Sequence, residues 1–563
     1  MIEATPPGLI LIVGAFISVL LPGRVRNVFM LILPILGFWQ LTQLEHGLHA
    51  QVEFFGQTLT LLRVDKLSLV FGYIFFIATE LSIIYALHIK DPVQQVAGLA
   101  YAGAAIGAVF AGDLISLFVF WELTAITSVF LIWAVRTEHA INVGLRYLII
   151  QVGSGVLLLT GALVLRHETG SIIFGHIGIE SLGGILIFIS FGVKAAFPLL
   201  HNWLQDAYPE ATVTGTVFLS AFTTKLAIYA LARGYAGTEI LIWIGVVMTG
   251  FPIFFAVIEN DLRRVLAYSL NNQLGFMVVG IGIGTELAIN GAASHAFAHI
   301  LYKALLFMSM GAVLLRTGTM NGSELGGLYK SMPWTTVLCI IGAASISGFP
   351  LFSGFVTKSM ILTAAAEEGY WAAWAVLLFA SAGVFHHSGI KIPFFAFFAH
   401  DQGHRVKEAP VNMLVAMGLA AALCIAIGVY PEPLYALLPY PVNYVPYTTA
   451  HVITMLQLLA FAALAFAVLM RTGLYPPELR STNLDTDWVY RRLAPNLIRS
   501  FVKSLGELRD ELARWAQMGV GFILDRAFQY HGPNSWLART WPIGGSALCV
   551  LTLLGGYLII YFI

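Results

Sequence analysis

The chain has little charge, few cysteines and no net charge. Only 11% of its 563 residues are Asp, Glu, Lys or Arg, whereas a soluble domain has about 25%. Hydrophobic residues make up 58% of the chain, which excludes a soluble globular protein and indicates a protein that crosses the lipid bilayer many times. Lys plus Arg equals Asp plus Glu at 30 each, so no excess of positive charge points to nucleic acid as a partner.

The cysteines are too few and too scattered for a redox or metal centre. Cys339, Cys424 and Cys549 lie far apart in apolar runs, without CxxC or zinc-type spacing. We therefore expect no cofactor and no bound metal in this chain. The apolar run near the N-terminus follows an acidic residue and is succeeded by further apolar segments, so it is expected to be a first membrane helix and not a removable signal.

Apolar stretches of about 20 residues predict an all-α polytopic membrane protein with about sixteen transmembrane helices. The loops between them alternate between rich and poor in Lys and Arg. Short cytoplasmic loops carry the excess of positive charge, so this alternation places both termini outside the cytoplasm. The basic loops contain Arg24, Arg26, Lys90, Arg136, Arg263, Arg264, Arg316, Lys330, Arg405 and Lys407.

Two membrane segments carry a helix break beside a lysine. Lys194 lies four residues before Pro198, which removes a helical hydrogen bond. A second apolar segment is interrupted by Gly and Pro in SGFPLFSGF, and Lys358 follows the interruption. Broken helices in corresponding positions are typical of inverted repeats with an ion site at the membrane midplane, and we predict such repeats at residues 95–234 and 239–399.

The remaining segments flank these two repeats. We predict N-terminal helices at 1–94, C-terminal core helices at 400–471, a polar loop with an amphipathic helix at 472–540, and a final span at 541–563. Between 497 and 515 apolar residues recur at steps of three and four with charges between them, which predicts a helix of roughly 25 to 35 residues along the cytoplasmic membrane surface. An ordinary surface helix that covers loops is the alternative.

Several ionisable residues lie within the predicted spans, where a charge costs at least ~3 kcal/mol. Glu122 is the one charge in its span, and opposite charge makes Lys194 its expected partner. Lys225 lies on the span after Lys194. We interpret these residues as stations on an ion path. The alternatives are lysines that extend to the membrane interface and a static buried ion pair.

A third group follows one face of the span near residue 300. His295, His299 and Lys303 are spaced by four residues and therefore share a helical stripe suited to proton hopping through water. A zinc site and core histidines with local hydrogen bonds are the alternatives. Lys358 follows the second break. Lys391, one turn after a His-His pair, is either a last station or a residue near the interface.

These motifs resemble the antiporter-like subunits shared by respiratory complex I, membrane-bound hydrogenases and Mrp-type cation/proton antiporters. The motifs are FWELT, GVKAAFPLLHNWLQDAYPEA, NDLRRVLAYSLNNQLG, HAFAHILYKALLFMSMG and SGFPLFSGFVTKSMIL, in order over about residues 60 to 431. FHHSGIKIPFFAFF and TVFLSAFTTKLAIYALARG look most like the D subunit of Mrp-type antiporters. The tail after residue 490 departs from that pattern and is similar, in abbreviated form, to the lateral helix of the largest complex I subunit of this type.

The resemblance implies proton transfer along a mid-membrane axis of a multi-subunit complex in a bacterial inner membrane. Glu122 and Lys194 would be the pair that receives the proton, Lys225 the connecting lysine, the His295 stripe part of the central axis, and Lys358 the distal lysine.

The function predicted from the sequence is a proton-conducting subunit, coupled to Na⁺ or K⁺ antiport. The alternatives are an energy-coupling channel for inorganic carbon uptake or for a redox-driven pump, and an inert structural scaffold. Other membrane subunits, protons, Na⁺ or K⁺ and the lipid bilayer are the expected partners, with no nucleic acid. Whether the complex is an enzyme stays open, because no haem, flavin, quinone or cluster motif is found.

Overall fold

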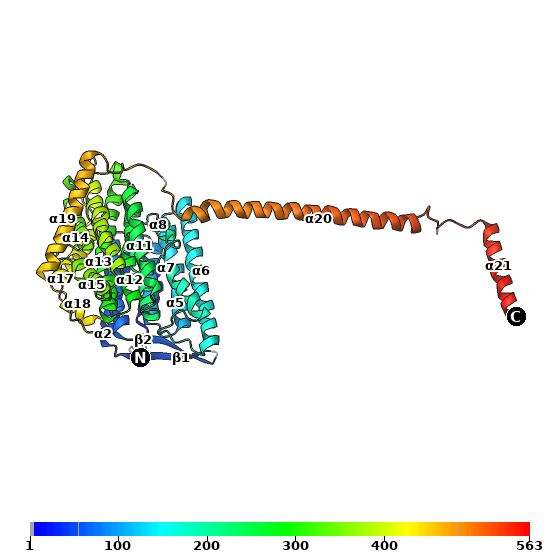
Figure 1. The fold of residues 1–563 in the computed structure, drawn as a ribbon, viewed down its shortest axis with the longest axis horizontal. Helices are drawn as coiled ribbons and strands as arrows, with labels where there is room; N and C mark the ends of the chain where they lie inside the picture. Colours follow the sequence, from blue (N-terminus) through cyan, green and yellow to red (C-terminus); the bar gives the residue numbers. More distant parts are fainter. Residues whose placement is uncertain (1–4, 55, 482, 537) are drawn as a thin grey trace. The chain divides into compact units, whose positions relative to one another are not determined.

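The computed structural model describes residues 5–54, 56–481, 483–536 and 538–563. The chain forms two compact units, Met1–Asn483 and Leu484–Ile563, and each is described by itself. Most of both units is helical (Figure 1), which confirms the helical membrane fold that the composition predicts.

The first unit opens with two helices and a β-hairpin. These elements are α1 (Pro7–Val19), α2 (Gly23–Gln43), β1 (Gly47–Phe54) and β2 (Gln57–Val64). The strands pair antiparallel and lie at one end of the helices of this unit (Figure 1), hereafter the hairpin end. The all-α prediction missed this hairpin, which forms because the segment between the second and third spans is too polar to enter the membrane and alternates in burial along β2.

The first predicted repeat corresponds to α4 through α10. After α3 (Lys66–Ala86) come α4 (Pro92–Phe110), α5 (Leu114–Trp133), α6 (Glu138–Thr169), α7 (Leu182–Lys194), α8 (Asn202–Ala207), α9 (Gly215–Ala221) and α10 (Thr223–Gly234).

The second predicted repeat corresponds to α11 through the π-helical turns that extend α16. It comprises α11 (Ile240–Ile258), α12 (Leu262–Ile283), α13 (Glu286–Thr317), η1 (Gly322–Glu324), η2 (Leu328–Lys330), α14 (Pro333–Ser347), α15 (Ser353–Glu367), α16 (Trp371–Val384), η3 (Phe385–Lys391) and η4 (Phe394–Phe398). The first unit then adds α17 (Val411–Val429), α18 (Glu432–Leu437) and α19 (Thr449–Thr472).

The two groups of helices share local features. Asp113 caps α5 and Asp261 caps α12, each by accepting two backbone N–H bonds of the first turn. Each Asp also forms an isolated β-bridge, with Ile173 and Asn321 respectively. In both groups the next helix, α6 or α13, has 32 residues. These shared features support related repeats, whose boundaries remain a prediction.

Both predicted helix breaks are confirmed. The chain leaves helical geometry between the end of α7 and the start of α8, and again between α14 and α15. Each break contains residues in the left-handed region. In the first break these are Ala196 and Leu199, with φ of 62° and 70°, and in the second they are Gly348 and Leu351, with φ of 73° and 75°.

Within the described ranges, twelve helices are long and apolar enough to cross a membrane, and α1, α7 and α14 are shorter apolar helices. The count of about sixteen spans remains a prediction. The second unit contains η5 (Val489–Leu493), α20 (Ala494–His531) and α21 (Ile543–Phe562). At 38 residues α20 is longer than the predicted 25 to 35, and its placement along a membrane surface remains a prediction.

Candidate functional site

The predicted site residues come from α5, α7, α10, α13, α15 and η3, all in the first unit. The seven cationic or titratable nitrogen side chains among them are at most 1% exposed, whereas Glu122 is partly buried. The seven are Lys194, Lys225, His295, His299, Lys303, Lys358 and Lys391. Burial this complete argues against the alternative in which Lys194 and Lys225 extend to the membrane interface.

Lys194 is held by α5, although not by the residue expected. Its Nζ donates to the carbonyl oxygen of Trp121 at 2.9 Å and to Oγ1 of Thr124 at 2.8 Å, and lies 4.2 Å from the centre of the Trp121 ring. The predicted contact with Glu122 is wrong in detail, because no ion pair within 4.0 Å joins these two described residues. The charges still interact through space.

The carboxyl of Glu122 points to α6 instead. A Cβ atom added at Gly155 would overlap Glu122 Oε1, so the carboxyl occupies the space that a side chain at this position would fill. Oε1 is buried and has no hydrogen-bond partner among the described residues. Gly155 was missed from the sequence, and the only signal for it is the GSG triplet inside an apolar run.

Trp121 is fixed by a hydrogen-bonded chain across three helices. Its Nε1 donates to Oγ of Ser154 on α6 at 3.0 Å, and Ser154 Oγ donates to the carbonyl of Ser190 on α7 at 2.9 Å. Because these bonds position the carbonyl and ring that contact Lys194, they preorganise the lysine site.

Lys225 lies at an interruption that the sequence did not predict. The expected span at 212–234 is divided into α9 and α10, with Phe222 between them. Nζ of Lys225 donates to the carbonyl of Ser220 at the end of α9. The interruption thus exposes a backbone carbonyl that the buried amine can bind, as in other membrane sites where broken helices face a polar interior.

The stripe on α13 contains two kinds of histidine. His295 contacts Thr357 Oγ1 through Nδ1 and Gln273 Oε1 through Nε2, both at 3.2 Å. Tyr302 donates to the same Gln273 oxygen at 3.1 Å. Neither ring nitrogen of His299 has a partner in the described part of the chain. The alternative of a core histidine with local hydrogen bonds therefore fits His295 and not His299.

Lys303 extends the stripe toward its neighbours. Its Nζ is buried and finds no hydrogen-bond partner among the residues that the structure describes, and it is close enough to Lys225 and His387 for electrostatic interaction. Gln273 and Tyr302 are functional candidates that the sequence reasoning missed. Their signals are the NNQ triplet in an apolar helix and a tyrosine directly before Lys303.

Two lysines lie beyond the stripe. Lys358 interacts electrostatically with His295, and its Nζ, which has no hydrogen-bond partner in the described ranges, lies 5.5 Å from the centre of the Phe276 ring. Lys391 interacts with His387. Electrostatic interactions therefore extend from Lys225 and Lys303 to Lys358 by way of the α13 histidines, and to Lys391 by way of His387.

The environment of Lys391 contains an acid that the sequence did not point to. Nζ lies 3.0 Å from Glu478 Oε1 and donates to the carbonyls of Val257 and Glu259 at 2.7 and 2.6 Å. Glu478 belongs to the loop after α19. Burial raises the pKa of its carboxyl above the ordinary value, and the charge of Lys391 opposes this shift. Nothing in the PPEL sequence around Glu478 distinguishes it from a solvated loop acid.

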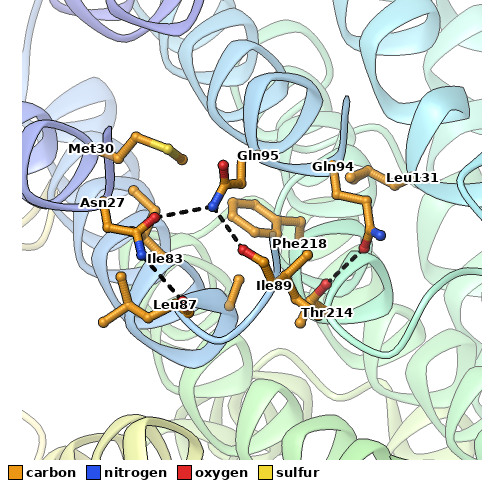
Figure 2. A pocket seen from close by; sticks show the side chains of 11 residues that line it. Asn27, Met30, Ile83, Leu87, Ile89, Gln94, Gln95, Leu131, Thr214 and Phe218 are labelled. Carbon is orange, nitrogen blue, oxygen red and sulfur yellow. Dashed lines mark hydrogen bonds between the residues drawn. The ribbon is translucent and has the colours of Figure 1, made fainter. Parts of the chain in front are cut away.

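Two further observations concern the rest of the molecule. In the described ranges, no three His, Cys, Asp or Glu side chains are grouped so that they could hold a metal ion. A small pocket with a volume of about 10 Å³ lies between the ends of α2, α3, α4 and α9. Figure 2 shows the hydrogen bonds around it, in which Gln95 donates to Asn27 and to the Ile89 carbonyl and Thr214 donates to Gln94. None of the predicted site residues lines it.

Comparison with known proteins agrees with this geometry. Residues 111–385 match the family described as NADH:quinone oxidoreductase/Mrp antiporter, TM. The chain is 32% identical to the D subunit of the Na⁺/H⁺ antiporter of Alkalihalophilus pseudofirmus over 353 residues, which cover 58% of this chain and 71% of that protein. It is 27% identical to hydrogenase-4 component B of Escherichia coli over 65% of this chain, and spans 62% of that longer protein.

A solved structure shares the fold. In the Mrp complex from Dietzia sp. DQ12-45-1b, a chain aligns with 99% of this one at a TM-score of 0.73 and 24% identity, and 62% of that chain is covered. The family resemblance inferred from the sequence motifs is confirmed by these matches. The chain therefore belongs to the NADH:quinone oxidoreductase/Mrp antiporter transmembrane family.

Proposed function

We propose that this protein is a proton-translocating subunit of a multi-subunit Mrp-type or complex I-like membrane complex. The observation that carries the proposal is the row of fully buried lysines and histidines, placed at helix breaks and along α13 in the fold of this family. A buried ionisable residue inside a membrane is costly and marks an ion pathway more often than a packing position.

The mechanism follows from the contacts of each station. Glu122 and Lys194 receive the proton, because the carboxyl and the amine interact through space while Trp121 and Thr124 hold the amine in place. Lys225 passes it to the α13 stripe. Lys303 and His299 lack hydrogen-bond partners among the described residues, so water is the natural bridge between them. The proton then reaches Lys358 or Lys391.

The charges of neighbouring stations couple their protonation states. When one ammonium forms, the next is disfavoured by like-charge repulsion. A charge rearrangement at the Glu122 end therefore propagates along the axis as successive proton transfers. This is how the subunit would couple proton movement to events in the other membrane subunits of its complex.

Relatives favour cation/proton antiport as the coupled process. One matched protein is named as the D subunit of a Na⁺/H⁺ antiporter, and coupling to Na⁺ or K⁺ is the first candidate. Another is a hydrogenase component, which supports the second candidate, a proton path in a redox-driven complex. The protein is a multi-pass membrane protein. We place it in a bacterial inner membrane with both termini outside the cytoplasm, on the loop charges.

The test is antiport by the whole complex in everted membrane vesicles. Lys194→Ala and Glu122→Gln are each expected to reduce Na⁺- or K⁺-dependent proton movement by at least tenfold, while the amount of assembled complex is unchanged. Lys407→Ala, in an exposed loop, is the matched control and should transport normally. Normal transport by an assembled Lys194→Ala complex would contradict the proposal.

A further inference from the structure

The segment after α19, which ends the first unit, folds back over the helices of that unit at the end opposite the hairpin (Figure 1). Tyr475 is buried and its ring packs on Phe466 and His386, with ring centres 5.3 and 5.6 Å apart. Asn483 donates to a carboxyl oxygen of Glu259 at 3.1 Å. The segment therefore has a defined position over the end of η3, although it contains no regular helix or strand between 474 and 481.

This position brings Glu478 to the last amine of the axis. The side chain of Lys391 is 0% exposed and that of Glu478 is 6% exposed, with 3.0 Å between Nζ and Oε1. The other neighbours bonded to Nζ are three backbone carbonyls, of Ala256, Val257 and Glu259. Carbonyls accept hydrogen bonds but cannot take up a proton at neutral pH, so among these contacts Glu478 is the one that can exchange a proton with Lys391.

Other titratable groups surround the pair at longer range. His386 and His387 on η3 and the carboxyl of Glu259 interact electrostatically with Lys391. Tyr475 interacts in the same way with Glu478. These groups adjust the charge balance at the pair, whereas direct proton transfer needs the short contact that Glu478 makes with Nζ.

The carboxyl of Glu478 is itself under-bonded. Apart from the contact with Lys391, its two buried oxygens find no hydrogen-bond donor in the described residues. A buried carboxylate that was purely structural would be expected to have further donors, because an unsatisfied buried charge is costly. Glu478 can remove this cost by taking a proton.

A polar cavity lies on the solvent side of the same cluster. It has a volume of about 290 Å³. Glu259 and Arg480 both line it. Glu259 also binds Lys391 through its carbonyl, and Arg480 follows Glu478 by two residues. The cavity is therefore lined by neighbours of the ion pair, while Lys391 and Glu478 themselves are not part of its lining. The complete lining is Glu259, Asn260, Asp261, Arg264, Asn321, Arg480 and Ser481. Such a cavity is large enough for several waters.

We propose that Glu478 is the proton-exchange group between Lys391 and the water of this cavity, and so completes the axis at the end opposite the hairpin. The inference rests on the proposed function, since it needs protons to reach Lys391. When a proton leaves the axis, an N–H bond of the Lys391 ammonium breaks and an O–H bond forms on the Glu478 carboxylate, which leaves a neutral amine and a neutral acid. The acid then releases its proton to a cavity water. When a proton enters the axis, the same steps run in reverse.

The experiment compares three variants in the assembled complex. Glu478→Gln keeps the size and a hydrogen-bonding oxygen but cannot carry a proton, and its antiport turnover is expected to fall at least tenfold. Glu478→Asp keeps a titratable group and should retain most of the turnover. Glu368→Gln, which changes an exposed acid directly after the end of α15, is the matched control and should behave as the unmodified protein.

Lys194→Ala is measured in parallel to separate the two proposals. Full turnover by Glu478→Gln together with an inactive Lys194→Ala complex overturns the role of Glu478 and leaves the proposed function intact. Full turnover by both variants overturns the proposed function as well. A purely structural Glu478 would lower the amount of assembled complex and leave turnover per complex unchanged, and that result also overturns the inference.

If the Glu478→Gln complex does not assemble, the pH profile of the Glu478→Asp complex decides. Aspartate has a lower intrinsic pKa and a shorter reach than glutamate. A proton-exchange group at this position must therefore shift the pH profile of turnover when it is changed to Asp. An unchanged profile with normal assembly overturns the inference.

Discussion

The two broken helices hold their lysines in opposite ways. Lys194 lies before the first break, and a carbonyl and a hydroxyl of α5 bind its amine. Lys358 lies after the second break, and its amine has no hydrogen-bond partner in the described residues. The first amine is thus held in place by two hydrogen bonds, whereas the second lies beside the Phe276 ring without such bonds. The two lysines therefore differ in how firmly their surroundings position them.

The two helices capped by Asp113 and Asp261, α5 and α12, also differ. α5 carries the carboxyl of Glu122, whereas the corresponding stretch of α12 has Asn271, Asn272 and Gln273 and no acid. Gln273 contacts His295 and Tyr302. One half of the molecule therefore supplies an internal counter-charge and the other supplies neutral hydrogen-bonding groups.

The most direct test of this difference between the two halves is to displace the Glu122 carboxyl without removing it. Gly155→Ala places a Cβ where Glu122 Oε1 now lies, so the carboxyl must move. We expect turnover to fall about tenfold or more with the complex still assembled, since charge placement and not charge number changes. Antiport in everted vesicles measures this effect.

Gly153 provides the control, because a Cβ there meets no atom within 4 Å. Gly153→Ala on the same helix should transport normally. Equal activity of the two alanine variants would show that the position of the Glu122 carboxyl does not matter to the first half of the axis.

A smaller effect is expected from removing one hydrogen bond to the Lys194 amine. Thr124→Val removes one hydrogen bond to the amine while keeping the shape of the side chain, and a bond to a charged group contributes about 1.5 kcal/mol or more. Turnover should fall ~3- to 10-fold. Thr127→Val is the control, because the Thr127 hydroxyl donates to the Leu123 carbonyl of its own helix. If both valine variants keep full turnover, preorganisation of Lys194 has no role in transport.

The smallest effect, on stability, is expected from substitutions at the two helix breaks. Gly348 has φ of 73°, and a Cβ there would lie 3.0 Å from the Met455 side chain and 3.5 Å from Lys358 Nζ. Gly348→Ala should lower stability by about 1 kcal/mol, measured as the melting temperature of the purified complex. Ala196→Gly in the first break removes the strain of a similar φ, but it also raises the conformational entropy of the unfolded chain. We therefore expect little change in the melting temperature.

Gly418→Ala in α17 is the reference for these measurements, since its added Cβ meets open space and alanine favours helix. If Gly418→Ala lowers the melting temperature as much as Gly348→Ala does, backbone strain at the second break is not the cause of the change.

Composition and short motifs were enough to predict a helical membrane protein, two broken helices, the lysines beside them and the family. These predictions succeeded because each depends on local physics: the cost of charge in lipid, the missing N–H of proline, and the spacing of one helical face. The β-hairpin was missed because its alternation is weak beside the strong apolar spans that flank it.

The sequence alone singled out the ionisable residues within the apolar segments as candidates for the proposed axis, since a charge inside an apolar run is visible in one dimension. Only the tertiary structure decided what each one touches. Lys194 binds the backbone of α5 and not the carboxyl of Glu122, Gly155 makes room for that carboxyl, and Glu478 comes from a loop distant in sequence to reach Lys391. Such contacts depend on how separate helices pack, and helix packing is not encoded in the spacing within any one of them.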